Sequence, residues 1–178
     1  MTLCLRNRQR DCPLDLRLLR RVLRFALERS LCASDYELCF HFVPALEMSN
    51  INEKFLDHIG PTDVITFNHG EGMRAGQTGS LRYGRLETCA TARPEPDDAR
   101  LHGEIFICPE VAVAQAREFR TSWQEEIVRY CVHGVLHLRG YEDLRVADRR
   151  KMKREEDRVV NELRKQFAVA RLRRARLK

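Results

Sequence analysis

Two histidines and an aspartate have the spacing of a metal site. His133 and His137 stand four residues apart in a run that reads as helix, and Gly140 and Asp143 follow in the pattern H-x-x-x-H-x-x-G-x-x-D. Residues four apart lie on one face of a helix, so both imidazoles can reach one ion. Gly140 can end the helix in a left-handed conformation, and the chain can then return Asp143 to that ion. The spacing is that of metzincin-type zinc sites, with aspartate as the third ligand.

This donor set favours a catalytic zinc over a structural one. Two histidines and one aspartate leave the fourth position of a tetrahedral Zn²⁺ site open for water, whose pKa the metal lowers towards about 7. His133 and His137 are therefore candidate catalytic residues through that metal-bound water, and together with Asp143 they are candidate ligands of one Zn²⁺ per chain. The competing interpretation is two ordinary histidines, packed or solvated, on the side of a helix.

Gly134 argues against a zinc peptidase. Zincins of the H-E-x-x-H type use the glutamate after the first histidine as general base, and Gly134 occupies that position here. We interpret this glycine as leaving space for a bulky substrate beside the metal. No role is assigned to the remaining histidines, which are His41, His58, His69 and His102.

The composition indicates a cytoplasmic globular protein. The chain has 178 residues, 43% of them hydrophobic, which suffices for one domain with a core. No run of about 18 apolar residues predicts a membrane span, and the charged N-terminal segment is unlike a signal peptide. Seven cysteines, an odd number without a C-x-x-C pair, are expected to be reduced and mostly buried thiols.

Charge is unevenly distributed along the chain. Residues 1–29 hold eight arginines against three acids, whereas residues 30–143 hold ten basic and eighteen acidic residues. Residues 144–178 hold fourteen basic residues against five acids. Basic ends around an acidic middle favour a polyanion partner, with the last helix and the tail contacting phosphates without reading sequence. A solvated helix face and a frayed tail explain the same pattern.

The elements that must position these residues alternate between strand and helix. Residues 68–102 lack periodicity and hold five of the nine glycines, so we predict a long mobile insertion there. The rest predicts a single α+β domain over residues 1–170, with a four-stranded mixed sheet, about five helices, and the metal site on a helix and the turn after it. Residues 171–178 are a basic C-terminal tail. Strands are expected at residues 2–9, at 36–43, after a turn within 60–67, and at 103–110. Helices are expected after Asp11 and Pro13, at 45–56, from Pro109 to about 119, from Ser122 as N-cap through both histidines, and at 144–170.

Three stretches resemble the YbeY family of bacterial rRNA-maturation endoribonucleases. "HGVLHLRGYED" (133–143) is similar to the family signature HGxLHLxGYDH. "INEKFLDHIGPTDVITF" (51–67) is similar to the family's LN-x-x-YR-x-KDKPTDVLSF segment, and "HGEIFICPEVAVAQA" (102–116) to its GDI-x-I-s segment and the following helix. The pieces occur in the family's order, from about residue 3 to about residue 162.

The resemblance implies a zinc-dependent α+β endoribonuclease specific for single-stranded RNA. It implies maturation of the 3′ end of 16S rRNA and a role in 70S ribosome quality control. The expected partners are therefore single-stranded rRNA and the 30S subunit of the ribosome, with neither DNA nor a membrane. By the same resemblance, His133 and His137 occupy the first two ligand positions, and Asp143 stands where the family usually has a third histidine.

Two positions depart from the family pattern. Asp143 makes the site one charge more negative, and Leu56 stands where the family usually has an arginine, a residue suited to gripping phosphate by two parallel hydrogen bonds. Arg139, within the signature, is a candidate substitute for that arginine. The alternative function is a ribosome-associated RNA-binding factor with a structural metal and weak or no catalysis, which the leucine favours.

Three further polar residues are candidates for holding RNA or orienting a ligand histidine. Thr62 and Asp63 precede a predicted strand whose end we expect to border the site, and Glu104 lies in a neighbouring predicted strand. Turn and strand-end chemistry explains the same three residues.

Overall fold

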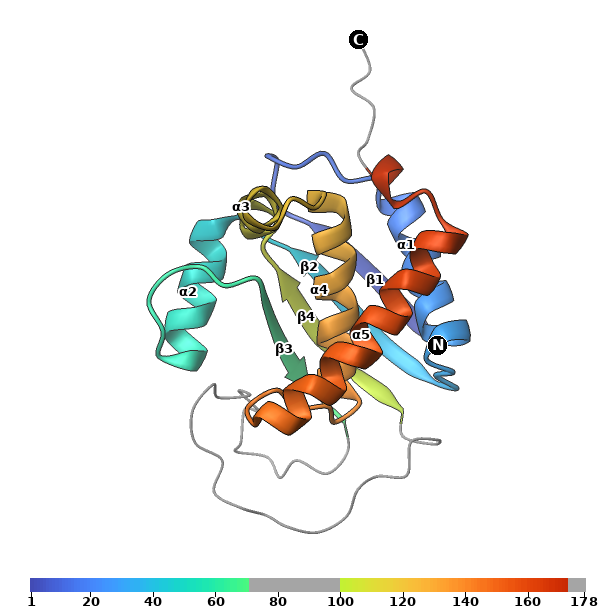
Figure 1. Ribbon diagram of the computed structural model, residues 1–178. Coiled ribbons are helices and arrows are strands. Elements are labelled where there is room, and N and C mark those ends of the chain that lie inside the picture. The colour runs from blue at the N-terminus through green and yellow to red at the C-terminus, as the bar shows by residue number, and fades with distance from the viewer. Residues whose placement is uncertain (71–99, 173–178) are drawn as a thin grey trace.

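A computed structural model describes residues 1–70 and 100–172, and it shows the expected α+β architecture (Figure 1). Four strands and five α-helices lie within these residues. The strands are β1 (Thr2–Asn7), β2 (Tyr36–Phe42), β3 (Val64–Asn68) and β4 (Leu101–Ile107). The helices are α1 (Leu16–Phe25), α2 (Ala45–Leu56), α3 (Pro109–Phe119), α4 (Trp123–Leu138) and α5 (Val146–Gln166), with a π-helical turn η1 (Ala26–Ser30) after α1 and a 3-10 turn η2 (Val169–Leu172) after α5.

The strands form one mixed sheet in the order β1-β2-β4-β3. β1 pairs with β2 and β2 with β4 in parallel, whereas β3 runs antiparallel to β4. The predicted four-stranded mixed sheet is therefore confirmed. The crossover from β1 to β2 is made by α1, as a parallel connection requires.

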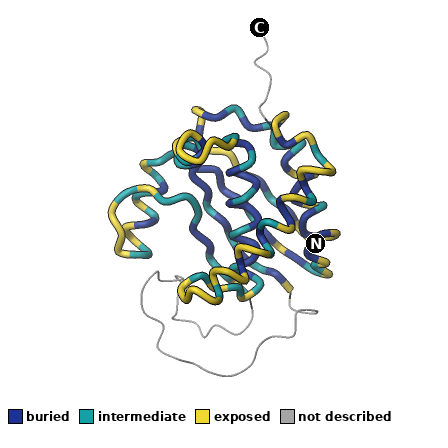
Figure 2. Tube along the Cα trace, viewed as in Figure 1, coloured by how far each residue is buried: buried dark blue, intermediate teal, exposed yellow. Residues whose placement is uncertain are grey.

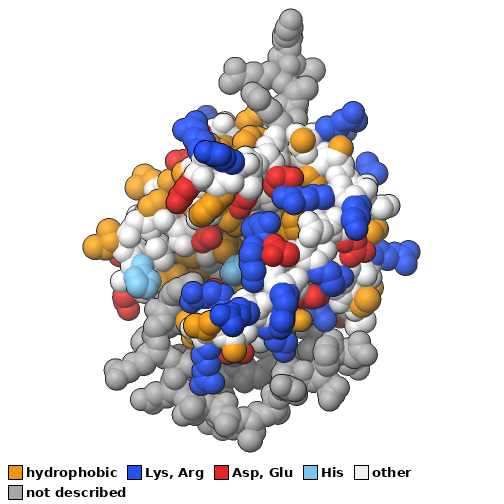
Figure 3. Space-filling view, in the orientation of Figure 1, with side chains coloured by type: hydrophobic (Ala, Val, Ile, Leu, Met, Phe, Trp, Pro, Cys, Tyr) orange, Lys and Arg blue, Asp and Glu red, His pale blue; other side chains and the backbone are white. Residues whose placement is uncertain are grey.

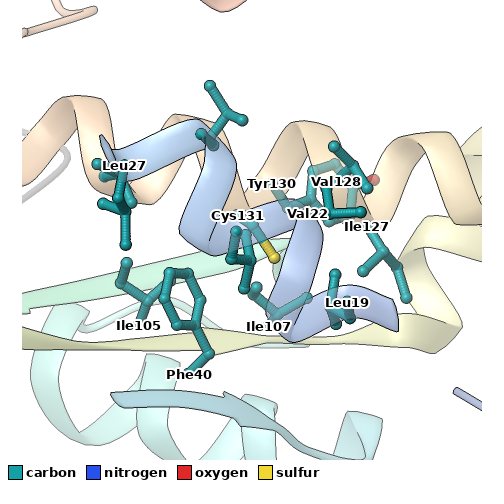
Figure 4. Close-up of a cluster of buried hydrophobic side chains, with 14 of the residues drawn as sticks. Leu19, Val22, Leu27, Phe40, Ile105, Ile107, Ile127, Val128, Tyr130 and Cys131 are labelled. Atoms are coloured by element: carbon teal, nitrogen blue, oxygen red, sulfur yellow. The ribbon is translucent and has the colours of Figure 1, made fainter. Parts of the chain in front are cut away.

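The two faces of the sheet carry different side chains because successive residues of a strand point to opposite sides. On one face, Phe40 of β2 and Ile105 and Ile107 of β4 are fully buried against α1 and α4, as Figure 4 shows. The dark blue centre of Figure 2 follows this layer, which α5 closes from outside. On the other face, Met48 of α2 packs with Ile65 of β3 in a smaller cluster. The helix that carries the candidate ligands thus lies on the more deeply buried face.

α4 is the central helix of the main layer. Ser122 caps its N-terminus by accepting a hydrogen bond from the Glu125 amide at 3.3 Å, as the capping-box pattern predicts. Eleven of its sixteen residues are buried, so the helix is wedged between the sheet and α5. Its position is therefore fixed by packing on two sides.

The prediction that Gly134 leaves space for substrate is wrong. A Cβ added at this position would lie 2.7 Å from Cγ2 of Ile105 and 3.1 Å from Oγ1 of Thr66. Each residue advances a helix by about 100°, so Gly134 faces the sheet while His133 faces away from it. The glycine allows α4 to approach β3 and β4 closely, and a glutamate side chain at this position would point into the core.

Several boundaries differ from the sequence-based expectation. α1 begins at Leu16, later than Asp11 and Pro13 suggest, because the Asp15 carboxylate caps it by accepting from the Arg17 and Leu18 amides. The last helix ends at Gln166, four residues before the predicted end at 170.

The expected insertion and tail are only partly described. β3 extends to Asn68 and β4 begins at Leu101, so both strands enter the expected insertion at 68–102. The rest of that insertion, 71–99, and most of the predicted tail, 173–178, lie outside the described residues.

The thiols are free and less buried than expected. All six cysteines in the described part of the chain are unpaired, as predicted, and Cys89 lies outside it. Three of the six, Cys12, Cys108 and Cys131, are buried. Among the described helices, none has both the length and the hydropathy to cross a membrane.

Candidate metal centre

The structure brings His133, His137 and Asp143 together. One ligand atom from each residue lies within 4.8 Å of the others, and all three side chains are partly buried. The two imidazoles come from the last two turns of α4, and their ring centroids are 4.6 Å apart. Asp143 comes from the segment between α4 and α5, so the group depends on the turn that ends α4.

Gly140 makes that turn. Its φ of +80° lies in the left-handed region that favours glycine. The Gly140 amide donates to the His137 carbonyl at 2.9 Å, and the Tyr141 amide donates to the Leu136 carbonyl at 3.0 Å, which is the pattern of a glycine-terminated helix. The chain therefore reverses immediately after the second histidine, as the sequence predicts, and Asp143 returns to the helix end.

Hydrogen bonds at Nδ1 define the tautomer of both rings. His137 Nδ1 lies 3.0 Å from the Tyr141 carbonyl, and His133 Nδ1 lies 3.0 Å from the Glu156 carboxylate. A carbonyl and an ionised carboxylate can only accept, so Nδ1 is the donor in each ring. Burial lowers the pKa of His137, which favours the neutral ring with an unprotonated Nε2.

The two Nε2 atoms face each other at 3.0 Å. If both rings are neutral and donate from Nδ1, neither Nε2 carries a proton, and a cation beside both nitrogens would relieve their repulsion. A metal held at about 2.0–2.1 Å from each nitrogen in tetrahedral geometry separates the nitrogens by about 3.3 Å. The donor set of two imidazoles and a carboxylate therefore fits a divalent metal.

Glu156 of α5 is the residue that sequence reasoning missed. It is 5% exposed and accepts hydrogen bonds from His133, from Arg129 Nη1 at 2.6 Å and from Lys153 Nζ at 3.1 Å. Burial alone would raise its pKa, but the bonds from His133 and Arg129 and the Lys153 charge outweigh burial and lower the pKa to about 2. A signal existed in the sequence, since Glu156 falls among the buried apolar positions of an otherwise charged helix.

Asp63 acts electrostatically on His137, and Thr62 is hydrogen-bonded to Asp63. The charge of Asp63 acts on His137, where it favours the protonated ring and so opposes the effect of burial. One Asp63 oxygen accepts from Thr62 Oγ1 at 3.0 Å and from the Val64 amide at 2.9 Å. These bonds fix the carboxylate at the start of β3.

Glu104 is not brought to this group. It alternates with Gly103, which faces Leu138 of α4, so its side chain lies on the opposite face of the sheet. There its two oxygens lie 3.0 Å from His41 Nε2 and 3.5 Å from His69 Nε2. This geometry does not support the predicted contact of Glu104 with substrate or ligand at the metal centre.

Of the two positions considered for gripping phosphate, one is a leucine and the other is an arginine that bonds to a backbone carbonyl. Leu56, at the end of α2, packs against the apolar cluster of Val43 and Met48. Arg139 donates from Nη1 to the carbonyl of Leu31, which follows η1. The catalytic role of Arg139 stays a prediction.

Known proteins resemble this chain in sequence and in fold. The family described as "Endoribonuclease YbeY" matches residues 5–164. A protein of that name from Beutenbergia cavernae is 33% identical over 129 residues, covering 72% of this chain and 75% of its own. One from Acidothermus cellulolyticus is 37% identical over 119 residues, covering 67% and 65%. The solution structure of TM1509 from Thermotoga maritima covers 93% of both chains with a TM-score of 0.55 and 23% identity, a likeness in fold alone.

Proposed function

The chain belongs to the YbeY family of endoribonucleases, and from this premise we propose that it is a zinc-dependent enzyme that cuts single-stranded RNA. We further propose that it matures the 3′ end of 16S rRNA and acts in ribosome quality control on the 30S subunit, in the cytoplasm. The observation that carries the proposal is the pair of Nε2 atoms that face each other at 3.0 Å, with Asp143 beside them, in the family's signature. One Zn²⁺ per chain is the metal that we assign to this group.

The metal ligands and the neighbouring polar residues would have different roles in RNA hydrolysis. His133, His137 and Asp143 would hold the metal, which when bound supplies Lewis acidity towards a phosphate oxygen and activates water as the nucleophile. Asp63, whose charge acts on His137, is the carboxylate that we assign to orienting the ligand or the RNA at this group. Thr62 limits the freedom of Asp63 through its hydrogen bond.

α5 supplies the positive charge that RNA requires. Lys and Arg side chains gather over this helix in Figure 3. Arg149, Arg150, Lys151 and Arg154 are all exposed on its first turns, close in sequence to Asp143. Such side chains neutralise phosphates without reading bases, which suits a nuclease that selects single strands.

A second candidate function is a ribosome-associated RNA-binding factor whose metal is structural. The specific observation in its favour is that Leu56 is packed in an apolar cluster while Arg139 is hydrogen-bonded to the Leu31 carbonyl. Both functions share the metal and the RNA, so cleavage decides between them.

The test measures metal content and RNA cleavage on the same preparations. Wild type and His133→Ala would be assayed with single-stranded RNA from a 16S 3′ end. We expect one zinc per wild-type chain and cleavage, both lost in the variant. Zinc without cleavage under any divalent metal would favour the binding factor, and no zinc after reconstitution would overturn the metal assignment. A 2′,3′-cyclic phosphate product would indicate attack by the ribose 2′-hydroxyl instead of water.

A further inference from the structure

The two ligand histidines are oriented by different kinds of acceptor. His137 donates its Nδ1 proton to the Tyr141 carbonyl, a backbone group of the same helix end. His133 donates its proton to Glu156, a side chain of a different helix. The orientation of His137 therefore depends only on α4 and the turn after it. The orientation of His133 requires that α5 packs against α4.

The oxygens of Glu156 have separate partners. Oε1 accepts from Arg129 Nη1 at 2.6 Å and from Lys153 Nζ at 3.1 Å, whereas Oε2 faces His133 Nδ1 at 3.0 Å. Arg129 is itself held by Asp157 at 2.7 Å and lies near Glu126 at 3.8 Å. Because the two cations fix Oε1, the carboxylate cannot turn away, and Oε2 is presented to the ring.

We propose that Glu156 is a positioning residue for the metal centre: its Oε2 selects the tautomer of His133 whose Nε2 is free to bind the metal. The proposal rests on the proposed function in taking this group as the working site. Arg129 acts one step further out by holding Oε1. Partners of this kind fix the orientation of metal-bound histidines, and their loss weakens metal affinity by about 10- to 100-fold.

Glu156→Gln tests the tautomer with little change in shape. Arg129 and Lys153 only donate, so they retain the glutamine oxygen at the Oε1 position. The amide nitrogen then replaces Oε2 and presents hydrogens to His133 Nδ1. The ring can accept that bond only by moving its proton to Nε2, which removes the metal ligand. The chain offers a matched control in Glu155→Gln, since Glu155 bonds to Arg158 on the same helix.

The experiment combines ¹⁵N NMR of the imidazoles in the metal-free protein with zinc titration by a competing chelator. We expect wild-type His133 to carry its proton on Nδ1 and Glu156→Gln to carry it on Nε2. His137 should keep its Nδ1 proton in both, as an internal control. Zinc affinity should fall about 10- to 100-fold in Glu156→Gln and stay within about twofold of wild type in Glu155→Gln.

The outcomes separate this inference from the proposed function. A wild-type His133 protonated on Nε2, or a Glu156→Gln variant with wild-type zinc affinity, would overturn the positioning role even if the enzyme cleaves RNA. Loss of affinity with the tautomer change, in a protein that never cleaves RNA, would uphold the positioning role and overturn the nuclease. The wild-type spectrum decides the tautomer even if the variant fails to fold.

Discussion

A histidine meets a carboxylate at 3.0 Å on each face of the sheet, and the two pairs differ in the ring nitrogen involved. Glu156 faces Nδ1 of His133, whereas Glu104 faces Nε2 of His41. The first contact leaves an Nε2 lone pair that converges with His137. The second occupies Nε2 and leaves the buried Nδ1 of His41 without a hydrogen-bond partner among the described residues. Distance alone therefore does not identify a metal centre, since what matters is whether unprotonated nitrogens converge.

The largest expected effect comes from removing the carboxylate ligand beside the two Nε2 atoms. Asp143→Ala removes a ligand outright, so zinc affinity should fall by more than the about 100-fold upper end expected for an outer partner. Glu142→Ala is the matched control, because this neighbouring carboxylate is exposed and outside the ligand group. Titration with zinc under a competing chelator measures both. Equal losses in the two variants would mean that general negative charge, and not ligation, holds the metal.

The next effect concerns which face of the molecule RNA meets. Replacing Arg150 and Arg154 of α5 with glutamine should weaken binding of single-stranded RNA and reduce the slope of log K against log salt by about 0.7 per lost phosphate contact. Arg6→Gln is the comparison, since Arg6 is exposed beside His41 on the opposite face. Its salt slope should match wild type. A loss at Arg6 as large as at α5 would place RNA on both faces.

A smaller effect on zinc affinity is expected at Glu104 than at Glu156. Glu104→Gln should leave zinc affinity within about twofold of wild type, because Glu104 lies across the sheet from the ligands. It should change the free energy of unfolding by less than about 1 kcal/mol, because the glutamine oxygen can still accept from His41 Nε2. Urea unfolding and zinc titration measure the two quantities. If zinc affinity fell as much as in Glu156→Gln, the His41–Glu104 pair would not differ from the His133–Glu156 pair in its effect on the metal.

The smallest effect is a pH dependence specific to His41. Burial lowers the pKa of this ring below its usual range, which Arg8 and Arg6 reinforce and Glu104 opposes. The unfolded chain takes up a proton as the pH falls through about 6.5 while folded His41 does not, so the free energy of unfolding should fall below that pH. His41→Gln should reduce that fall. Urea unfolding of metal-free protein at about pH 7.5 and 5.5 measures it, and equal falls in both proteins would contradict the prediction.

Local patterns were sufficient for much of the fold. The helix at 45–56 and the Pro109 start of α3 agree with the sequence-based bounds because their signals lie within the segment itself. The sequence-based start of α1 is too early because Asp11, Pro13 and Asp15 all resemble helix starts, and only the hydrogen bonds of Asp15 distinguish it.

The sequence by itself determined the ligand group, because His133, His137, Gly140 and Asp143 lie within eleven residues and helix geometry relates them. Tertiary structure alone decided the rest. The alternation of β4 put Glu104 on the far face, and the docking of α4 on the sheet turned Gly134 inward. Glu156 met His133 across 23 positions of sequence only because α5 packs on α4. Contacts between helices and strands depend on which of their faces pack together, and the spacing of residues within one segment does not determine that packing.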